Sequence, residues 1–489
     1  MGTFIRDWYT TIGQKMQTFS QRVTDSLEVS KSKNQIPVLD GARAIACLAV
    51  LFYHVNYLAR IYDIWRPLHG INNLVATLAY FGDSGVILFF LLSGFLLFLP
   101  YAKALLFDSP WPSLRRFYLR RIFRIIPGYY VALFLIALFF HSEFLHHSHW
   151  HDLWLFLTFR MNFAISQPLN GPFWTLAIEF QFYLLLPLVA WLFSLIVSRG
   201  TVRWRMLKLT FCLSLLTAWG LLTRYWGLSI ADTPQLDFLI PHPVSIMLKP
   251  YIYGDTGKFF EVFAVGMLIC MVYIYMQNSP SAEHWGIKLR RLSPLMLTAG
   301  LTILFLLSLW HFYYININPD NHTKAYPVFT FLDPYIPRIV KYWAQWQAMG
   351  YAISYGLCLL ALLHGSPKLR RPFEWSVLRW IGLISFSLYM WHVPLIFLFL
   401  NAIDNNLRSQ GWNHIVQYGA FWCWTLIVII PVSLTLYRWV EMPGMRIGEL
   451  IIRKLEAQKK KPIVVTQSDD YPQQAPVSIR YKEEEKIVT

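Results

Sequence analysis

The segment Leu39–Val55, LDGARAIACLAVLFYHV, is apolar enough to cross a membrane, yet it carries Arg43 near its start and His54 well inside. Charged and titratable groups are costly in hydrocarbon and therefore mark functional sites in membrane segments. Eleven steps of about 100° return to within about 20° of the starting direction. The two residues therefore share one face of the predicted helix, about 16 Å apart along its axis. This face predicts a cavity that runs from Arg43 at the cytoplasmic end to His54 near mid-membrane.

A purely structural role for this pair stays open at this point. Arg43 would then snorkel to lipid headgroups, and His54 would bond a neighbouring helix. The rest of the chain decides between the two interpretations.

The composition is that of a membrane protein rather than a soluble one. Of 489 residues, 56% are hydrophobic and only 14% are charged. This predicts an all-α, polytopic integral membrane protein with about ten transmembrane helices, surrounded by membrane lipids. The net charge of +16 does not indicate a nucleic-acid partner, because the basic residues form short clusters between apolar segments. The five cysteines lie inside apolar segments without the spacing of a disulfide framework or a zinc site.

Runs of roughly 20 apolar residues locate the spans. They are about 41–59, 84–100, 126–142, 174–198, 209–230, 257–276, 294–312, 346–364, 380–400 and 416–438. Every second loop is basic, which predicts that both termini are cytoplasmic in a multi-pass protein of the plasma membrane. The segment His151–Ile165 is apolar but interrupted by Arg160, and we expect an interfacial or re-entrant piece on the exterior.

Three regions follow along the chain. Residues 1–35 carry apolar positions at intervals of three or four, which predicts an amphipathic helix on the cytoplasmic surface. Residues 36–445 form the transmembrane domain. Residues 446–489 are a cytoplasmic tail whose charged composition favours disorder.

Several further stretches carry polar groups inside apolar segments. They are Phe89–Phe95 (FFLLSGF), Tyr118–Pro127 (YLRRIFRIIP), Trp174–Pro187 (WTLAIEFQFYLLLP) and Gly382–Pro394 (GLISFSLYMWHVP). Together with the Arg43 and His54 segment they resemble the motifs of the acyltransferase-3 family, membrane enzymes that O-acylate sugars and other acceptors. The resemblance covers roughly residues 36–445, and an arginine and histidine separated by ten residues and followed by SGF is a specific combination.

The resemblance implies a role for each matching residue. His54 and Arg43 match the essential histidine and its paired arginine. The other matching positions are Ser93-Gly94-Phe95, Arg120, Arg121 and Arg124, Trp174 with Glu179 and Tyr183, Ser387 and Tyr389 with His392, and Glu441-Met442-Pro443, where Met442 departs from the expected basic residue.

Acyl transfer from a thioester to a hydroxyl needs a base and a means of stabilising an oxyanion. We expect His54 to be the base, because imidazole titrates near neutrality, with a transient acyl-histidine as the alternative. A buried Glu179 needs a partner: it orients a histidine, engages the acceptor, or forms a structural ion pair with an arginine. His392 can reach the same cavity and ranks below His54. Ser93, Trp174, Tyr183, Ser387, Tyr389 and His392 are the candidate cavity and acceptor residues.

The donor is expected to be acyl-CoA, with acetyl the favoured group, and no cofactor is expected to stay bound. Coenzyme A carries phosphates, and guanidinium groups fit phosphate oxygens well. Arg116, Arg120, Arg121 and Arg124 are therefore the candidate phosphate-binding residues, although basic residues are also expected at a cytoplasmic helix end. The acceptor is expected to be a hydroxyl of a carbohydrate, that is, of a glycan, a lipid-linked sugar or a glycosylated small molecule.

Other functions remain as alternatives. The broken segment Gly82-Asp83-Ser84-Gly85 suits a transporter of a small polar or sugar substrate, and a non-catalytic scaffold is a third possibility. Histidines 141, 146, 147, 149 and 151 crowd one exterior loop, but few carboxylates and no cysteine accompany them, so no metal site is predicted.

Overall fold

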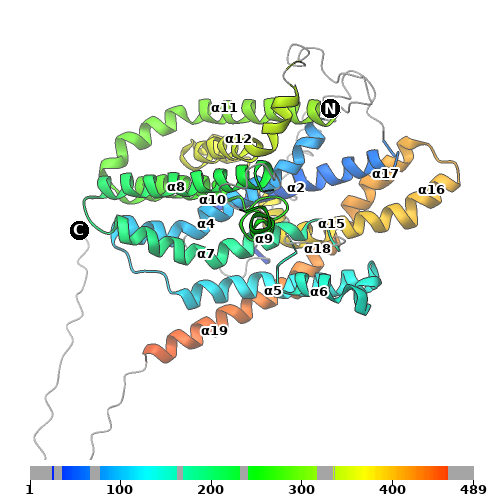
Figure 1. Cartoon of the computed structure of the whole chain (residues 1–489), viewed down its shortest axis with the longest axis horizontal. Coiled ribbons are helices and arrows are strands. Elements are labelled where there is room, and N and C mark those ends of the chain that lie inside the picture. Colours follow the sequence, from blue (N-terminus) through cyan, green and yellow to red (C-terminus); the bar gives the residue numbers. More distant parts are fainter. Residues whose placement is uncertain are drawn as a thin grey trace, which may run out of the picture.

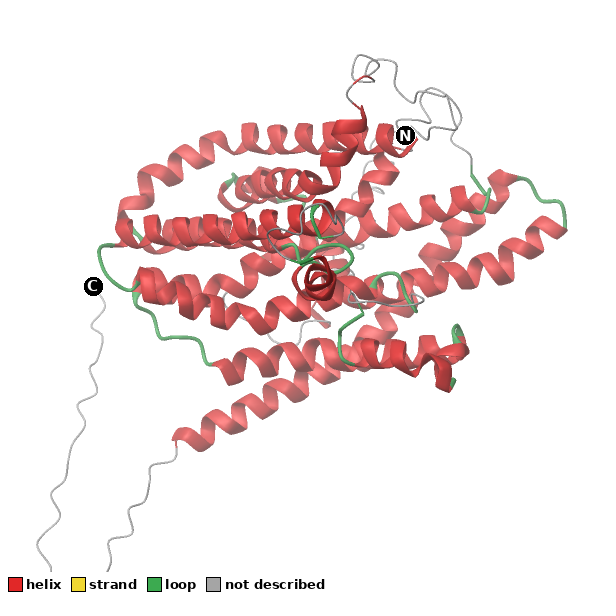
Figure 2. Ribbon diagram, in the orientation of Figure 1, coloured by secondary structure: helices red, strands yellow, loops and turns green. Residues whose placement is uncertain are grey.

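The computed structural model describes residues 25–26, 36–65, 77–161, 169–231, 241–316, 334 and 336–460. Among these residues it contains helices and turns but no strands (Figures 1 and 2). Ten helical segments are long and apolar enough to span a membrane: Pro37–Ile61, Thr77–Phe107, Leu114–Phe139, Phe173–Val197, Val202–Ser229, Phe260–Asn278, Pro280–His311, Tyr342–His364, Ser385–Ser409 and His414–Gln458. The predicted all-α polytopic fold is confirmed, and each of the ten predicted segments falls on one of these spans.

The spans are built from the following helices. They are α2 (Pro37–Ile61), α4 (Gly85–Phe107), α5 (Leu114–Phe139), α7 (Phe173–Val197), α8 (Val202–Ser229), α10 (Phe260–Asn278), α11 (Glu283–Asn316), α12 (Ile336–His364), α15 (Ser385–Phe399), α16 (Asn405–Ser409), α17 (His414–Trp424), α18 (Ile430–Leu436) and α19 (Met442–Lys460).

Shorter helices connect or interrupt them. They are η1 (Phe81–Ser84), η2 (Ser142–Leu145), η3 (His147–His149), α6 (Trp150–Leu157), α9 (His242–Ile252), η5 (Pro280–Ala282), α13 (Pro367–Arg370), α14 (Ser376–Leu383), η7 (Leu400–Asp404), η8 (Thr425–Ile429) and η9 (Tyr437–Glu441).

The bundle has two chemically different ends. Most long helices run from left to right in Figure 1, with α6 at the lower right and the end of α19 at the lower left. Because successive spans alternate in direction, the clusters Arg115–Arg116, Arg203–Arg205, Lys288–Arg291 and Lys368–Arg371 fall at one end, which we call the basic end. The end that carries α6 and α9 is called the opposite end.

A buried centre and a lipid-facing periphery divide the spans. In the spans of α4, α10 and α15, 67% of the most apolar window is buried, against 28% for α8 and 22% for α11. Gly94 and Gly266 let α4 and α10 approach closely, because a Cβ on either one would lie 2.3 Å or less from a carbonyl oxygen of the other helix. The span of α2 is intermediate, with 56% of its window buried, and that of α7 is less buried, at 39%.

Two boundaries differ from the sequence-based expectation. The predicted segment 380–400 is broken at Ile384, where α14 ends and α15 begins. Residues 446–460, assigned to the tail, instead continue the last helix as part of α19, where Arg116 and Arg120 pair with two of its glutamates. The described part of 151–165 contains most of the short α6 and is not among the ten spans, as predicted. The predicted leader helix, apart from residues 25–26, and residues 461–489 lie outside the described residues.

Candidate active site

Two histidines from distant helices meet at the centre of the bundle. His54 on α2 and His392 on α15 have ring centroids 4.8 Å apart. Nδ1 of His54 lies 3.2 Å from Nε2 of His392. In each ring Nδ1 also lies near the carbonyl oxygen four residues earlier, at 2.9 Å from Val50 and 3.1 Å from Leu388. His392 is only 1% exposed. The two helices therefore hold the imidazoles as one unit.

The hydrogen-bond partners favour one tautomer for each ring. A neutral imidazole nitrogen that faces a carbonyl oxygen carries the proton, so both Nδ1 atoms are donors and both Nε2 atoms are acceptors. His54 Nδ1–H is then shared between Val50 O and His392 Nε2. This arrangement leaves Nε2 of His54 as a free base on a side chain that lines a cavity.

That cavity is the larger of two neighbouring cavities, and His54 lines only this one. It has a volume of about 480 Å³, within the range of small-molecule sites. Its lining residues come from α2, η1, α4, α7, α8, α12, α15 and the turns next to α7 and α10: Val50, Tyr53, His54, Asp83, Ser84, Val86, Ile87, Gly171, Pro172, Trp174, Arg224, Tyr253, Thr256, Phe259, Ala344, Gln347, Ala348, Tyr351 and Tyr389. We call it the large cavity. Several of these residues belong to the loops of the opposite end.

A smaller cavity of about 60 Å³ contains the other predicted catalytic residues. Arg43 and Glu179 both line it, and it shares Val86 and Tyr389 with the large cavity. Arg43 donates to Ser385 Oγ at 3.4 Å, directly after the break between α14 and α15. We call it the small cavity. Arg43 and His54 thus lie on one helix but line two adjacent cavities, whereas their spacing predicts a single cavity lined by both.

Glu179 has the polar partners that its burial requires. Ser93 donates to Oε1 at 3.0 Å, and the Tyr183 hydroxyl donates to Oε2 at 2.6 Å. The sequence predicts a histidine, an acceptor hydroxyl or an arginine as the partner of the Glu179 carboxylate. Arg43 and Arg121 are close enough for their charges to interact with Glu179, but hydroxyl groups make its direct bonds.

The arginine cluster on α5 divides into two pairs. Arg116 and Arg120 face α19, where they pair with Glu456 at 3.2 Å and Glu449 at 2.9 Å. Arg121 and Arg124 point the other way and lie close enough to Arg43 for their charges to interact with it, near the Tyr183 hydroxyl. Nε of Arg121 is buried and has no hydrogen-bond partner among the described residues. The inner pair is therefore the one that adjoins the small cavity.

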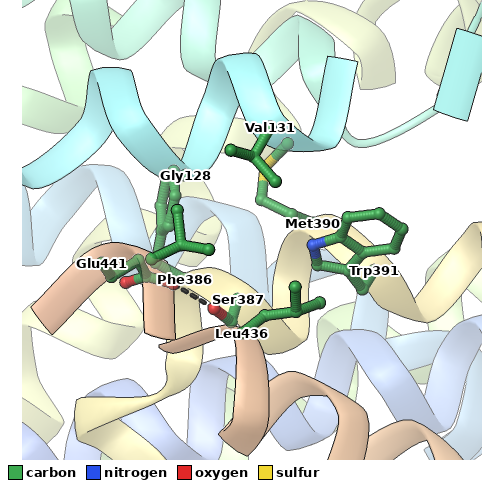
Figure 3. A pocket seen from close by; sticks show the side chains of 9 residues that line it. Gly128, Val131, Phe386, Ser387, Met390, Trp391, Leu436 and Glu441 are labelled. Carbon is green, nitrogen blue, oxygen red and sulfur yellow. Dashed lines mark hydrogen bonds between the residues drawn. The ribbon is translucent and has the colours of Figure 1, made fainter. Parts of the chain in front are cut away.

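Not all the predicted site residues come together. Trp174 and Tyr389 line the large cavity, and the Tyr389 hydroxyl is hydrogen-bonded to Thr175 at 3.1 Å. Ser387 instead donates to Glu441 in a separate space of about 10 Å³ between α5, α15 and η9 (Figure 3). This pair ties the last span to the helix of His392. Neither residue lines the two larger cavities, although Phe386 lines both this space and the small cavity.

Sequence reasoning did not identify several polar residues of the large cavity. Asp83 was noted only within a broken helix that suited a transporter, and Arg224, Thr256 and Tyr351 were not singled out. An arginine inside an apolar span is a detectable signal, and Arg224 forms a buried ion pair with Glu261 at 2.7 Å. Among the described residues, no group of three or more His, Cys, Asp or Glu side chains is placed to hold a metal ion.

Several known proteins are similar to this chain over most of its length. The sequence is 26% identical over 434 residues to a peptidoglycan O-acetyltransferase of Listeria monocytogenes, an alignment that covers 84% of this chain and 56% of the relative. A putative peptidoglycan O-acetyltransferase of Bacillus subtilis is 26% identical, with 83% and 54% covered, and a putative O-acetyltransferase of Staphylococcus aureus is 24% identical, with 86% and 58% covered.

The chain thus spans little more than half the length of these curated relatives. No solved structure matches it significantly. The family model described as an acyltransferase domain matches residues 36–438, which is most of the chain and includes both cavities. The protein therefore belongs to the acyltransferase-3 family.

Proposed function

We propose that the protein is a membrane O-acetyltransferase that moves an acetyl group from acetyl-CoA to a hydroxyl of a glycan. The observation that carries the proposal is the position of His54, whose free Nε2 belongs to a side chain on the wall of a roomy cavity next to the cavity of Arg43 and Glu179. The names of the relatives, which include peptidoglycan O-acetyltransferases, support a glycan acceptor.

The reaction needs one proton transfer and one exchange of bonds. Nε2 of His54 takes the acceptor hydroxyl proton while the hydroxyl oxygen attacks the thioester carbonyl carbon. The C–S bond then breaks, the proton passes to the coenzyme A sulfur, and the products are an acetyl ester and free CoA. The Tyr389 hydroxyl, on the wall shared by the two cavities, is the proposed donor to the oxyanion.

The donor is proposed to enter from the basic end. Arg121 and Arg124 provide the phosphate site, and Arg43 lies deeper on the same route. The buried, unpartnered Nε of Arg121 supports this assignment, because a buried guanidinium donor without a partner is costly unless a ligand satisfies it. The concentration of positive charge in the loops of this end supports a cytoplasmic location for this end and for both termini.

The acceptor is proposed to enter from the opposite end through the large cavity. The Gly82–Gly85 segment, which suited a transporter by sequence, lines this cavity at Asp83 and Ser84. Family membership favours an enzyme that uses the segment to hold an acceptor.

The test uses purified protein in proteoliposomes with radiolabelled acetyl-CoA supplied to one face and a panel of soluble sugars to the other. The panel contains methyl hexosides, oligomers of N-acetylglucosamine and muropeptide disaccharides. We expect saturable CoA release and an acetyl ester on at least one sugar, found by mass spectrometry. CoA release no faster than from empty liposomes with every sugar would overturn the proposal.

A further inference from the structure

The large cavity contains buried polar atoms that no described residue satisfies. Oδ1 of Asp83, the Tyr351 hydroxyl and Oγ1 of Thr256 all lack a hydrogen-bond partner among the described residues. All three residues line the large cavity. Buried polar groups in native proteins are almost always bonded, so three unsatisfied groups around one cavity indicate a ligand that carries several hydroxyl groups.

Close packing of η1 on α2 positions Asp83. A Cβ on Gly82 would lie 2.0 Å from the carbonyl oxygen of Ala49, so only glycine permits this approach. Ser84 then anchors the segment by donating to Phe81 O at 2.7 Å and bonding the Tyr355 hydroxyl at 2.8 Å. Asp83 is therefore held on a rigid turn against the helix that carries His54.

The charges around the cavity favour a neutral, hydroxylated ligand. Arg224 also lines the cavity, and Glu261 compensates its charge at 2.7 Å. Nε2 of His311 lies 3.7 Å from Oδ2 of Asp83, beyond hydrogen-bond distance. Oδ1 of Asp83 has no partner among the described residues, so Asp83 retains acceptor capacity and disfavours an anion at this position.

Aromatic side chains supply the remaining walls. Trp174, Tyr53, Tyr253, Tyr351 and Tyr389 all line the cavity. Rings of this kind combine apolar contact area with polar edges, which suits a sugar ring that has apolar C–H faces and a hydroxylated rim.

We infer that Asp83 binds two neighbouring hydroxyl groups of an acceptor sugar and so places a third hydroxyl at His54. The inference rests on the proposed function and deepens it, because it names the substrate class and the residue that selects it. A carboxylate only accepts hydrogen bonds and has two oxygens for a pair of adjacent O–H donors. Asp83 is a specificity residue, and it takes no part in proton transfer.

The first test measures sugar binding without donor. Isothermal titration of the protein in nanodiscs with methyl hexosides compares the wild type with Asp83→Asn, which keeps one acceptor oxygen and replaces the other by a donor. We expect Kd to rise at least tenfold. Asp83→Glu retains the carboxylate, and its thermal stability shows that the variant is folded. We expect this variant to regain part of the affinity. Asp108→Asn, at the basic end where Asp108 pairs with Arg205, is the matched control and leaves Kd unchanged.

The second test removes single hydroxyls from the sugar. A monodeoxy hexoside that lacks one of the paired hydroxyls should bind the wild type about tenfold more weakly, yet lose much less affinity for Asp83→Asn, because the two changes remove the same contact. Equal losses in both proteins, or no saturable hexoside binding by the wild type, would overturn the inference. Failure of the proposed function is distinguishable, since it would appear as sugar binding without acetyl transfer.

Discussion

Nδ1 of His54 and Nε2 of His392 lie 3.2 Å apart, although 338 positions separate the residues in the chain. The contact gives His392 a positioning role, because its Nε2 accepts the proton that fixes the tautomer of His54. His392 itself does not line either of the two larger cavities.

Substitution of His392 tests this positioning role. We expect His392→Ala to lower kcat for acetyl transfer about tenfold, the value of one lost hydrogen bond, with little change in either KM. His392→Gln should recover part of the rate, because its amide oxygen can accept the His54 proton. His414→Ala, at an exposed position, is the control. A silent His392→Ala would leave the pair with a packing role only.

The two arginine pairs on α5 should differ in their effect on the donor. Replacement of Arg121 and Arg124 by Gln removes the proposed phosphate site and should raise KM for acetyl-CoA by about tenfold or more. The same change at Arg116 and Arg120 should alter KM less than about threefold, since exposed ion pairs contribute little. If the two double variants raise KM for acetyl-CoA equally, the assignment of distinct roles to the two arginine pairs is wrong.

Removal of the Tyr183 hydroxyl should destabilise the small cavity. Tyr183→Phe leaves the Glu179 carboxylate with one direct donor, and we expect a loss of about 1–3 kcal/mol in the free energy of unfolding. Thermal unfolding in detergent measures the effect. Tyr118→Phe removes a longer bond, 3.2 Å to Leu184 O, at a more exposed position and serves as control. Equal melting temperatures for the two variants would contradict the importance of the Glu179 network.

Lys258, between α9 and α10, predicts a pH dependence of stability. Burial lowers the pKa of its ammonium group from 10.5 to about 8. The unfolded chain therefore binds more protons between these values, so this residue makes stability rise as pH increases from about 8 toward 10.5. Lys258→Met should remove that rise and increase Tm at pH 7 by a few degrees. If Tm changes with pH in the same way in the wild type and in Lys258→Met, Lys258 is not the cause of the pH dependence.

Local patterns predicted the fold and part of the site. Hydropathy located all ten spans, and helical spacing placed Arg43 and His54 on one face. Contacts between distant segments were not predictable, because a single sequence does not show which residues of two helices lie opposite each other. The bonds of Ser93 to Glu179 and of Ser387 to Glu441 are examples, as is the pairing of Arg116 and Arg120 with α19. The large cavity is lined by residues from several helices and turns. The roles of Asp83 and Tyr351 could therefore be recognised only in the folded chain.

The central claim is that His54 activates the acceptor hydroxyl. Single-turnover transfer of radiolabelled acetyl from acetyl-CoA to the best sugar of the panel tests it, with wild type and His54→Gln compared in nanodiscs and acetyl-CoA binding measured in parallel. We predict that His54→Gln binds acetyl-CoA with unchanged affinity and transfers acetyl at a rate lower by about 10²–10⁴-fold. Transfer by His54→Gln at a rate near that of the wild type would contradict it.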